Sequence, residues 1–397
     1  MRILIVSSLW PPRVLGGAEL YAYDLAAHLR AAGHEVAAVT WGVDGDDVVA
    51  VVPPWPYPID EYTSKNAAQR ALMHSRDIFN VSARKALDRA LRTFRPDVVH
   101  SHGVPGMSGS VLALPSQRGV PHVHTIHDYW LLCQRLSMVK RSGVACEQRC
   151  ASCLAICAVR NATIARHAPQ ILLAVSEAVA REHEVLGWAR TRLRVVPNPV
   201  EPMTGVTRPD ARSDRPLTFG YIGQVARHKG VHTLVDAFTA FAASRNGSAR
   251  PPRLLIAGTG ALRDELSLRT PPSVEWLGWV DDAGKRGFYS AVDCLVVPSE
   301  WKDPAPLVVN EARGIGVPVI GARAGGIPEL IAPESTPLLF PSGDRVALQE
   351  RLETFATNPV AYASPAGSRL AGWDVHLERV LTAYEDARVS RAASRPT

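Results

Sequence analysis

Short apolar runs alternate with amphipathic stretches along the chain, and this alternation predicts an α/β protein. The runs are continuous and rich in Val and Ile, which is typical of strands buried on both faces of a parallel sheet. In the first half we expect such strands at Arg2–Ser8, Glu35–Thr40, Asp97–His102, His122–His127, Ile171–Ser176 and Leu193–Pro197. A helix is predicted at Ala18–Arg30, with Gly33 as its stop signal.

The alternation stops at Glu201–Pro216, a segment without an apolar period that we interpret as an interdomain linker. It then restarts, with helices predicted at Val231–Ser244 and Leu307–Gly314 and strands at Thr218–Ile222, Arg253–Ala257, Val274–Leu277, Cys294–Pro298, Pro318–Gly321 and Pro337–Phe340. Two series of strand–helix units predict two doubly wound, Rossmann-like domains, at 1–200 and 217–372, that face each other across a cleft. An amphipathic helix is predicted at Trp373–Ala387, in the C-terminal segment 373–397.

Composition narrows the possible classes of protein and ligand only slightly. The chain has 397 residues, of which 46% are hydrophobic and 21% charged, as in ordinary soluble proteins. Its net charge of +6 mildly favours anionic ligands, but no Lys/Arg run indicates a nucleic-acid partner. Neither a signal peptide nor an apolar stretch of ~18 residues is visible. We therefore expect a cytoplasmic protein, with peripheral contact at the inner membrane face left open.

Chemistry in open α/β sheets is expected in the loops that follow strands. The loop Pro11–Glu19 contains Gly16 and Gly17 and leads into a helix, whose N-terminus favours an anion such as phosphate. The loop Tyr221–Gly230 places Lys229 before the next helix, where a cation can bind a diphosphate. Taken alone, each loop is equally well explained as an ordinary strand–helix turn.

Two carboxylates flank the start of the helix predicted at Leu307–Gly314. Asp303 lies in the preceding loop, Pro306 suits the first helical position, and Glu311 lies just over one turn into the helix. The two acids can bind different hydroxyl groups of one ligand around the helix N-terminus, although each alone is more often a surface acid. His127 ends a predicted strand and is either a sugar-binding or a structural histidine.

Together these segments resemble the retaining glycosyltransferases of family 4, which have the GT-B fold. Pro298–Leu330 is similar to the family's two acids separated by seven residues and to its GGxPE loop, and Tyr221–Phe238 resembles its GR-x-KG segment. The motif PPRVLGGAE resembles the N-terminal glycine loop, VVPNPV at Val195–Val200 the end of the first domain, and HDYWLLC a bacterial subset of the family. The resemblance covers nearly the whole chain.

The resemblance implies transfer of a sugar from a nucleotide-sugar donor to a hydroxyl of a glycan, lipid or small-molecule acceptor. It implies catalytic roles for His127, Asp303 and Lys229, and donor-binding roles for Gly16, Gly17, Gln224, Lys229, Val280, Asp303, Pro306, Leu307 and Glu311. It also implies retention of the anomeric configuration and a C-terminal helix that crosses back to the first domain. We expect no catalytic cofactor and no catalytic metal.

This chain departs from the family pattern at two positions. Asp303 stands where the family usually has Glu, and Gln224 stands where it usually has Arg. Gln can donate a hydrogen bond but cannot neutralise a phosphate, so Lys229 must carry more of that task, with Arg227 as a possible helper.

Two other functions stay open: a nucleotide-sugar epimerase of GT-B architecture, which needs no separate acceptor, and a nucleotide-sugar-binding protein that has lost catalysis, which the two departures suggest. Acceptor-binding loops are expected in the first domain, where the aromatic side chains of the irregular segment Pro53–Lys65 either stack on sugar rings or simply pack.

Five of the six cysteines lie between Cys133 and Cys157. Cys146, Cys150, Cys153 and Cys157 include a C-x-x-C pair and predict a structural zinc site, with Cys133 as the alternative first ligand. An iron–sulfur cluster and free thiols buried in a helix are the competing interpretations. The sixth cysteine, Cys294, is expected in the core.

Overall fold

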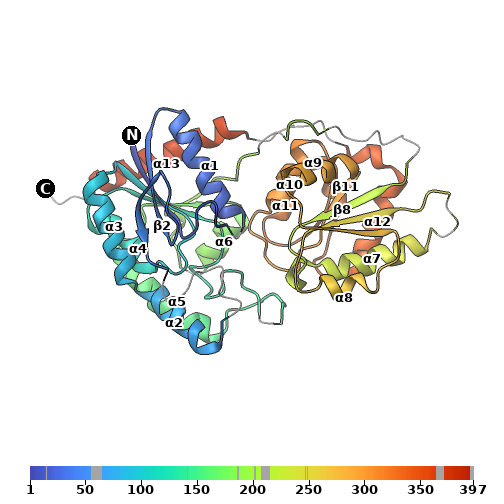
Figure 1. Ribbon diagram of the computed structural model, residues 1–397, viewed down its shortest axis with the longest axis horizontal. Helices are drawn as coiled ribbons and strands as arrows, with labels where there is room; N and C mark the ends of the chain where they lie inside the picture. The colour runs from blue at the N-terminus through green and yellow to red at the C-terminus, as the bar shows by residue number, and fades with distance from the viewer. Residues whose placement is uncertain are drawn as a thin grey trace. The chain divides into compact units, whose positions relative to one another are not determined.

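The computed structural model describes residues 1–14, 16–54, 65–140, 142–185, 187–200, 203–206, 215–245, 247, 249–363 and 371–393. The chain forms two compact units (Figure 1). The first unit comprises Met1–Ser137, Gln148–Asn198 and Trp373–Thr397, and the second comprises Met138–Glu147 and Pro199–Gly372.

Within the described residues, the first unit contains a seven-stranded parallel sheet in the order β3-β2-β1-β4-β5-β6-β7. Its strands are β1 (Arg2–Val6), β2 (Glu35–Trp41), β3 (Val48–Val52), β4 (Val98–Ser101), β5 (His122–Ile126), β6 (Ile171–Ala174) and β7 (Leu193–Val195). Its α-helices are α1 (Gly17–Ala31), α2 (Ala67–Ile78), α3 (Val81–Phe94), α4 (Gly109–Gln117), α5 (Ala151–Ile164), α6 (Glu177–Val185) and α13 (Trp373–Ala393).

The second unit contains a six-stranded parallel sheet among the residues described, in the order β10-β9-β8-β11-β12-β13. Its strands are β8 (Thr218–Ile222), β9 (Arg253–Ala257), β10 (Val274–Gly278), β11 (Cys294–Val297), β12 (Val319–Ala322) and β13 (Leu339–Phe340). Its α-helices are α7 (Val231–Ala243), α8 (Arg263–Ser267), α9 (Asp282–Ala291), α10 (Leu307–Gly314), α11 (Ile327–Leu330) and α12 (Arg345–Thr357). Short 3-10 helices across both units are η2 (Ala165–His167), η3 (Arg190–Arg192), η4 (Arg227–Lys229), η5 (Pro333–Leu338) and η6 (Pro359–Tyr362).

The C-terminal helix α13 packs beside α1 on one face of the first sheet (Figure 1). Its buried residues recur every three or four positions and so form one helical face; they are His376, Val380, Ala383, Tyr384 and Ala387. Two of them make hydrogen bonds into the unit: the Tyr384 hydroxyl lies 2.8 Å from His100 Nδ1, and His376 Nε2 lies 2.7 Å from the Tyr21 hydroxyl. The last helix of the chain therefore belongs to the core of the first unit.

The core of the second unit is aromatic on one face of its sheet. The Phe219 ring of β8 packs edge-on against rings from α7 and α12, namely Phe238, Phe241 and Phe355. The next residue, Gly220, faces α9 on the other side, where an added Cβ would lie 2.5 Å from a Val292 side-chain carbon. Glycine at this position lets α9 approach the sheet closely.

The expected strands are present, and β8, β9 and α10 have the predicted bounds. The edge strand β3 was not predicted. Most of the predicted linker Glu201–Pro216 and of the aromatic segment Pro53–Lys65 lies outside the described residues. In the described part of the chain, no helix is both long and apolar enough to cross a membrane.

Candidate functional site

Three loops meet at the carboxyl edge of the second sheet because β8, β11 and β12 are neighbours in it. The strand order reverses between β8 and β11, and ligands of doubly wound sheets bind at such switch points. Lys229 ends η4 after β8, and Asp303 follows β11; Lys229 Nζ lies 2.7 Å from Asp303 Oδ2. The structure therefore brings together two of the three residues predicted to be catalytic.

Asp303 is 4% exposed and is held by several donors. Its Oδ2 also accepts hydrogen bonds from Ser299 Oγ at 3.2 Å and from Trp301 Nε1 at 3.1 Å. The ammonium of Lys229 lies 4.9 Å from the centre of the Trp301 ring, within range of a cation–π contact. The Lys229 ammonium and two neutral donors converge on this carboxylate, so its position as a hydrogen-bond acceptor is fixed.

Glycines allow these loops to approach one another. Gly325, after β12, has a φ of +55°, and a Cβ there would lie 2.2 Å from the Asp303 carbonyl oxygen. That same oxygen accepts a hydrogen bond from Gly326 N at 2.8 Å. Gly230, after Lys229, has a φ of +71°, and its Cβ would lie 1.9 Å from the carbonyl oxygen of Pro298. Both positions require glycine for conformation and for space.

Glu311 is held from the side by α9. Lys285 Nζ forms an ion pair with Glu311 Oε1, and the Tyr289 hydroxyl donates to Oε2 at 2.9 Å. Leu307 is the first residue of α10, so its N–H lies at the end of the helix where amides have no intrahelical acceptor. We predicted Pro306 at the first helical position. It occupies the N-cap instead, one residue before the helix begins.

The remaining predicted residues of the second unit lie in neighbouring loops. Gln224 is exposed in the loop after β8, and its carbonyl oxygen accepts a hydrogen bond from the Tyr221 hydroxyl at 2.7 Å. Val280 lies between β10 and α9 and packs against the core of the unit. Ion pairs thus join Lys229 to Asp303 and Lys285 to Glu311. Gln224 is held by a hydrogen bond to its backbone, and Val280 is held by packing.

In the first unit, Gly16 and Gly17 form the start of α1. Gly16 is the N-cap, and its N–H donates to Glu19 Oε2 at 2.9 Å. A Cβ added to Gly16 would find only that carboxylate oxygen among surrounding atoms, 4.0 Å away. The backbone at this helix N-terminus is therefore accessible, as an anion-binding loop requires.

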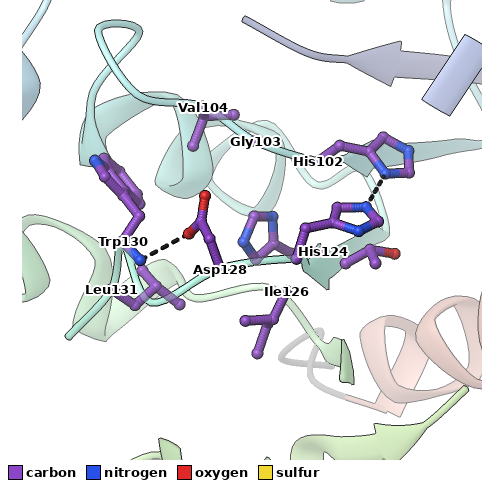
Figure 2. A pocket seen from close by; sticks show the side chains of 10 residues that line it. His102, Gly103, Val104, His124, Ile126, Asp128, Trp130 and Leu131 are labelled. Atoms are coloured by element: carbon purple, nitrogen blue, oxygen red, sulfur yellow. Dashed lines mark hydrogen bonds between the residues drawn. The ribbon is translucent and has the colours of Figure 1, made fainter. Parts of the chain in front are cut away.

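His127 lies in a pocket at the carboxyl ends of β4 and β5. The pocket is lined by His102, Gly103, Val104, His124, Thr125, Ile126, His127, Asp128, Trp130 and Leu131 (Figure 2). His127 Nε2 lies 3.2 Å from His102 Nδ1, and its ring packs edge-on against Tyr21. Burial lowers the pKa of His127 to about 3, so the imidazole is neutral at physiological pH.

Asp128 is a pocket residue that the sequence interpretation did not single out. Figure 2 shows its carboxylate joined to the Trp130 amide, which donates to Oδ1 at 2.7 Å. Burial raises the pKa of Asp128 to about 7, so near neutral pH this group can either donate or accept a proton. Its only signal in the sequence is its position next to His127.

A buried ion pair supports the wall of this pocket. Asp77 Oδ2, from α2, accepts hydrogen bonds from Trp130 Nε1 at 2.6 Å and from Arg160 Nη1, of α5, at 3.1 Å. Asp77 Oδ1 accepts from Gly106 N at 2.7 Å. The Arg160 side chain is 0% exposed and its guanidinium lies 4.1 Å from the Trp130 ring centre. Two helices thus fix the loop that follows His127.

Replacing Asp77 by Ala is expected to lower the free energy of unfolding of the first unit by about 3–5 kcal/mol, because Arg160 would keep its charge in the interior without a partner. Urea denaturation followed by tryptophan fluorescence measures this loss. Glu35→Ala is the matched control: it breaks the exposed Arg2–Glu35 ion pair and should cost only about 0–1 kcal/mol. Equal losses in the two variants would contradict the assigned role of the buried pair.

The clustered cysteines surround the start of α5. Cys133 Sγ and Cys153 Sγ lie 3.7 Å apart and are buried, while Cys150 is exposed at the N-cap. Cys157 Sγ accepts a hydrogen bond from Arg160 Nη2 at 3.1 Å, and Cys146 lies in the segment that groups with the second unit. As placed, the described residues include no group of three or more His, Cys, Asp or Glu that could hold a metal ion. The zinc site therefore stays a prediction.

Comparison with known proteins gives consistent matches. The sequence model of Glycosyltransferase Family 4 matches residues 15–203, and that of Glycosyl transferases group 1 matches residues 216–358. A glycogen synthase of Mycobacterium tuberculosis is 24% identical over an alignment of 430 positions that covers 100% of this chain and 95% of the synthase.

Solved structures show the same architecture. Sucrose-phosphate synthase from Thermosynechococcus elongatus is similar with a TM-score of 0.72 at 21% identity, covering 98% of this chain and 99% of that one. Anabaena HepE in complex with UDP-glucose is similar with a TM-score of 0.64 at 18% identity, covering 99% of this chain and 100% of that one. The predicted fold, two Rossmann-like α/β units of the GT-B class, is confirmed.

Proposed function

Because the chain belongs to glycosyltransferase family 4, we propose that it is a retaining, metal-independent enzyme that moves a sugar from a nucleotide-sugar donor to an acceptor hydroxyl. The acceptor is a glycan, a lipid or a small molecule. For a lipid acceptor, we propose that the protein also makes peripheral contact with the inner face of the membrane.

The observation that carries this proposal is the contact between Lys229 and Asp303 beside the N-terminus of α10. Breaking a glycosyl–phosphate bond builds negative charge on the leaving diphosphate, which a preorganised cation and backbone amides stabilise. Lys229 and the N–H of Leu307 supply such groups in the proposed site. Asp303, held in place by Lys229, Ser299 and Trp301, would accept a hydrogen bond from a hydroxyl of the donor sugar.

The Lys229–Asp303 ion pair also preorganises the proposed site. In the proposed site the ammonium is shared between the carboxylate and the diphosphate, so a carboxylate 2.7 Å away positions Lys229 before the donor arrives. Glu311, fixed by Lys285 and Tyr289, would bind the ribose hydroxyls. In the first unit, His127 would keep the sugar-binding role that the family resemblance implies.

The names of similar proteins support the donor class. HepE was solved with UDP-glucose, and other relatives are named glycogen synthase and D-inositol 3-phosphate glycosyltransferase. These names span polymeric and small acceptors, so they leave the acceptor class to experiment.

A thermal-shift panel across nucleoside diphosphates and their sugars tests the proposal, because a ligand that binds only the folded protein raises its melting temperature. The donor found in this way is then incubated with candidate acceptors, and NMR determines the anomeric configuration of the product. Retained configuration and unchanged rate in a chelator are the expected results. Isomerised donor without acceptor would identify an epimerase, and binding without turnover would identify a protein that has lost catalysis; either result would overturn the proposed transfer.

Lys229→Ala and Glu311→Ala are each expected to weaken donor binding by about 1.5–3 kcal/mol, or roughly 10- to 150-fold in Kd, since each removes a charge-assisted contact. Isothermal titration with the donor measures the change. Arg345→Ala serves as the matched charge-removal control, because this exposed residue begins α12 on the opposite side of the sheet from α9 and α10. Affinity that stays unchanged in both site variants would contradict the assigned residues.

A further inference from the structure

We propose that Cys150, Cys153 and Cys133 form a redox-active site that reacts with a low-molecular-weight disulfide and ends as a buried disulfide within the chain. Cys150 is the attacking thiol, Cys153 resolves the mixed disulfide, and Cys133 finally takes the bond to Cys153. All three residues belong to the first unit. The site is separate from the residues proposed for donor binding, and its test requires no sugar transfer.

The C-x-x-C pair lies at the start of a helix. Cys150 is the N-cap of α5, has an extended backbone (φ −71°, ψ 160°) and is exposed. Cys153 lies three residues later and is buried, with 5% of its surface exposed. A C-x-x-C pair at a helix N-terminus is a recurring setting for reactive thiols. Cys150 can therefore meet a small disulfide in solution, whereas Cys153 is reached only through its neighbours.

Donors at this helix N-terminus favour a thiolate on Cys150. The Ser152 hydroxyl lies 3.2 Å from the Cys150 sulfur, and the backbone N–H of Cys153 also donates to it. These hydrogen bonds lower the pKa of the Cys150 thiol to about 7, whereas burial raises the pKa of Cys153. The thiolate is the nucleophile in thiol–disulfide exchange. The geometry and the charge therefore both assign the first attack to Cys150.

Cys153 is the central member of the three, because its thiol contacts both of the others. It hydrogen-bonds to the Cys150 sulfur, and its own sulfur lies 3.7 Å from Cys133 Sγ. Cys133 comes from a position 20 residues away in the chain and is 3% exposed. An S–S bond is about 2.0 Å long, so the two buried sulfurs need to approach by less than about 2 Å.

Hydrogen bonds on both sides of Cys133 hold its loop against α5. Gln134 Nε2 donates to Ser152 Oγ at 3.1 Å, one residue before Cys153. Asn161 Nδ2, further along the helix, donates to the Leu131 carbonyl oxygen at 3.0 Å. The loop and the helix are therefore fixed relative to each other where the two buried sulfurs meet.

Three exchange steps balance atoms and electrons. The Cys150 thiolate attacks the small disulfide, whose S–S bond breaks, and one small thiolate leaves. That thiolate takes the proton of Cys153, which attacks the Cys150 sulfur and displaces the second small thiolate. The second thiolate takes the proton of Cys133, which attacks the Cys153 sulfur, and Cys150 leaves as a thiolate. One small disulfide is thus reduced to two thiols while Cys133 and Cys153 are oxidised to a disulfide.

The disulfide would join the loop after His127 to α5. The same loop carries Trp130 in the pocket wall, so oxidation would add a covalent brace at the edge of this pocket. A cross-link between residues distant in sequence restricts the unfolded chain, so the oxidised first unit should melt at a higher temperature than the reduced one. Calorimetry of the two forms measures the difference, and equal melting temperatures would overturn the bracing role.

Oxidised glutathione, a small disulfide, is the probe that tests the proposal. Reduced protein is incubated with it, and differential alkylation with peptide mass spectrometry follows each thiol over time. Cys150 should react first, and the final product should be Cys133–Cys153 with Cys150 free again. Cys153→Ser should accumulate glutathione on Cys150, and Cys150→Ser should slow oxidation at least about 10-fold. Cys294→Ala, in the core of the second unit, is the matched control and should keep the rate.

A second measurement uses the unsubstituted protein and so does not depend on the folding of any variant. A brief pulse of iodoacetamide on the reduced protein should label Cys150 ahead of the buried thiols of Cys133 and Cys153. Three results would overturn the proposal: first attack at another cysteine, a final disulfide that stays at Cys150–Cys153 or includes Cys157, or zinc bound so tightly by these cysteines that glutathione does not react.

Discussion

Lowering the pH from about 7.5 to about 5 is expected to unfold the first unit while the second stays folded. Eleven of the 13 histidines of the chain belong to the first unit, and four of them lie buried on the neighbouring strands β4 and β5 or directly after β4. They are His100, His102, His122 and His124, and burial lowers the pKa of every one; for His122 and His124 it falls to about 3.

The direction of the effect follows from where each state binds protons. Above about pH 6.5 these imidazoles are neutral in both the folded and the unfolded chain, so they contribute no pH dependence. Below it the unfolded chain takes up protons and the folded chain does not, until the lowered folded pKa is reached, which is about 3 for His122 and His124. Each histidine then costs roughly 1.4 kcal/mol per pH unit, or about 2 kcal/mol at pH 5.

Four such groups together approach the whole stability of a typical domain, about 5–15 kcal/mol. His127, His183 and His376, whose pKa values burial also lowers, act in the same direction. Asp128 acts in the opposite direction, because a folded pKa of about 7 makes its folded form bind a proton first as the pH falls. The stability gained from this one carboxyl group offsets the stability lost from one imidazole. The first unit as a whole therefore still loses stability as the pH falls.

Differential scanning calorimetry across this pH range, with separate transitions for the two units, measures the effect. His124→Asn should reduce the steepness of the acid transition by about one proton. His167→Gln, at an exposed histidine in η2, is the matched control and should leave the slope as it is. An acid midpoint shared by both units, or one below about pH 4, would contradict the prediction.

Ending the chain at Gly372 is expected to prevent the first unit from folding stably, although every residue removed lies at the far end of the sequence. The deletion takes away α13 and so uncovers the face of the sheet that carries Ile3, Ile5 and Val123. It also removes Tyr384 from His100 and His376 from Tyr21. Each large buried apolar side chain is worth about 1.5–3 kcal/mol, so loss of the helix exceeds the stability of a marginal domain.

Calorimetry of the truncated protein should show the transition of the second unit alone. Ending the chain at Ala393 is the control, since it keeps the whole of α13. Tyr384→Phe provides a graded variant: it keeps the ring and loses one hydrogen bond, so the free energy of unfolding should fall by only about 1 kcal/mol. A first unit that melts unchanged without α13 would refute the role given to the helix.

The strands of both sheets were predictable because most are buried on both faces and leave uninterrupted apolar runs. β8 and β9 matched to the residue, since a proline precedes each run and a glycine follows it. The edge strand β3 was missed although Asp47 and Pro53 bound its apolar run Val48–Val52. Nothing in this run shows that Val49 and Val51 stay exposed, because an edge strand takes its place by pairing with its neighbour, here β2.

The candidate site also has parts that could be predicted from the sequence and parts that could not. The loops that carry Lys229, Asp303 and Glu311 could be found from motifs, because each motif lies within one segment of the chain. The ion pair between Asp77 and Arg160 could not, because its partners lie 83 residues apart in sequence and neither belongs to a local pattern. The raised pKa of Asp128 likewise depends on burial by other segments, which no spacing of residues expresses.

The route of the chain makes most of the second unit, Pro199–Gly372, an insertion into the first, apart from the separate short segment Met138–Glu147. Val200 N donates to the carbonyl oxygen of Ala371 at 3.1 Å, so the segment that enters this unit and the one that leaves it run together. In the first unit the matching ends also meet, where His376 Nδ1 lies 2.9 Å from the Pro197 carbonyl oxygen. Residues 200–371 are therefore a cassette that a short bridge could replace, or that the equivalent segment of a relative could exchange. Recombination at these two paired junctions would exchange most of the second unit in one step while leaving the gene segments of the first unit intact.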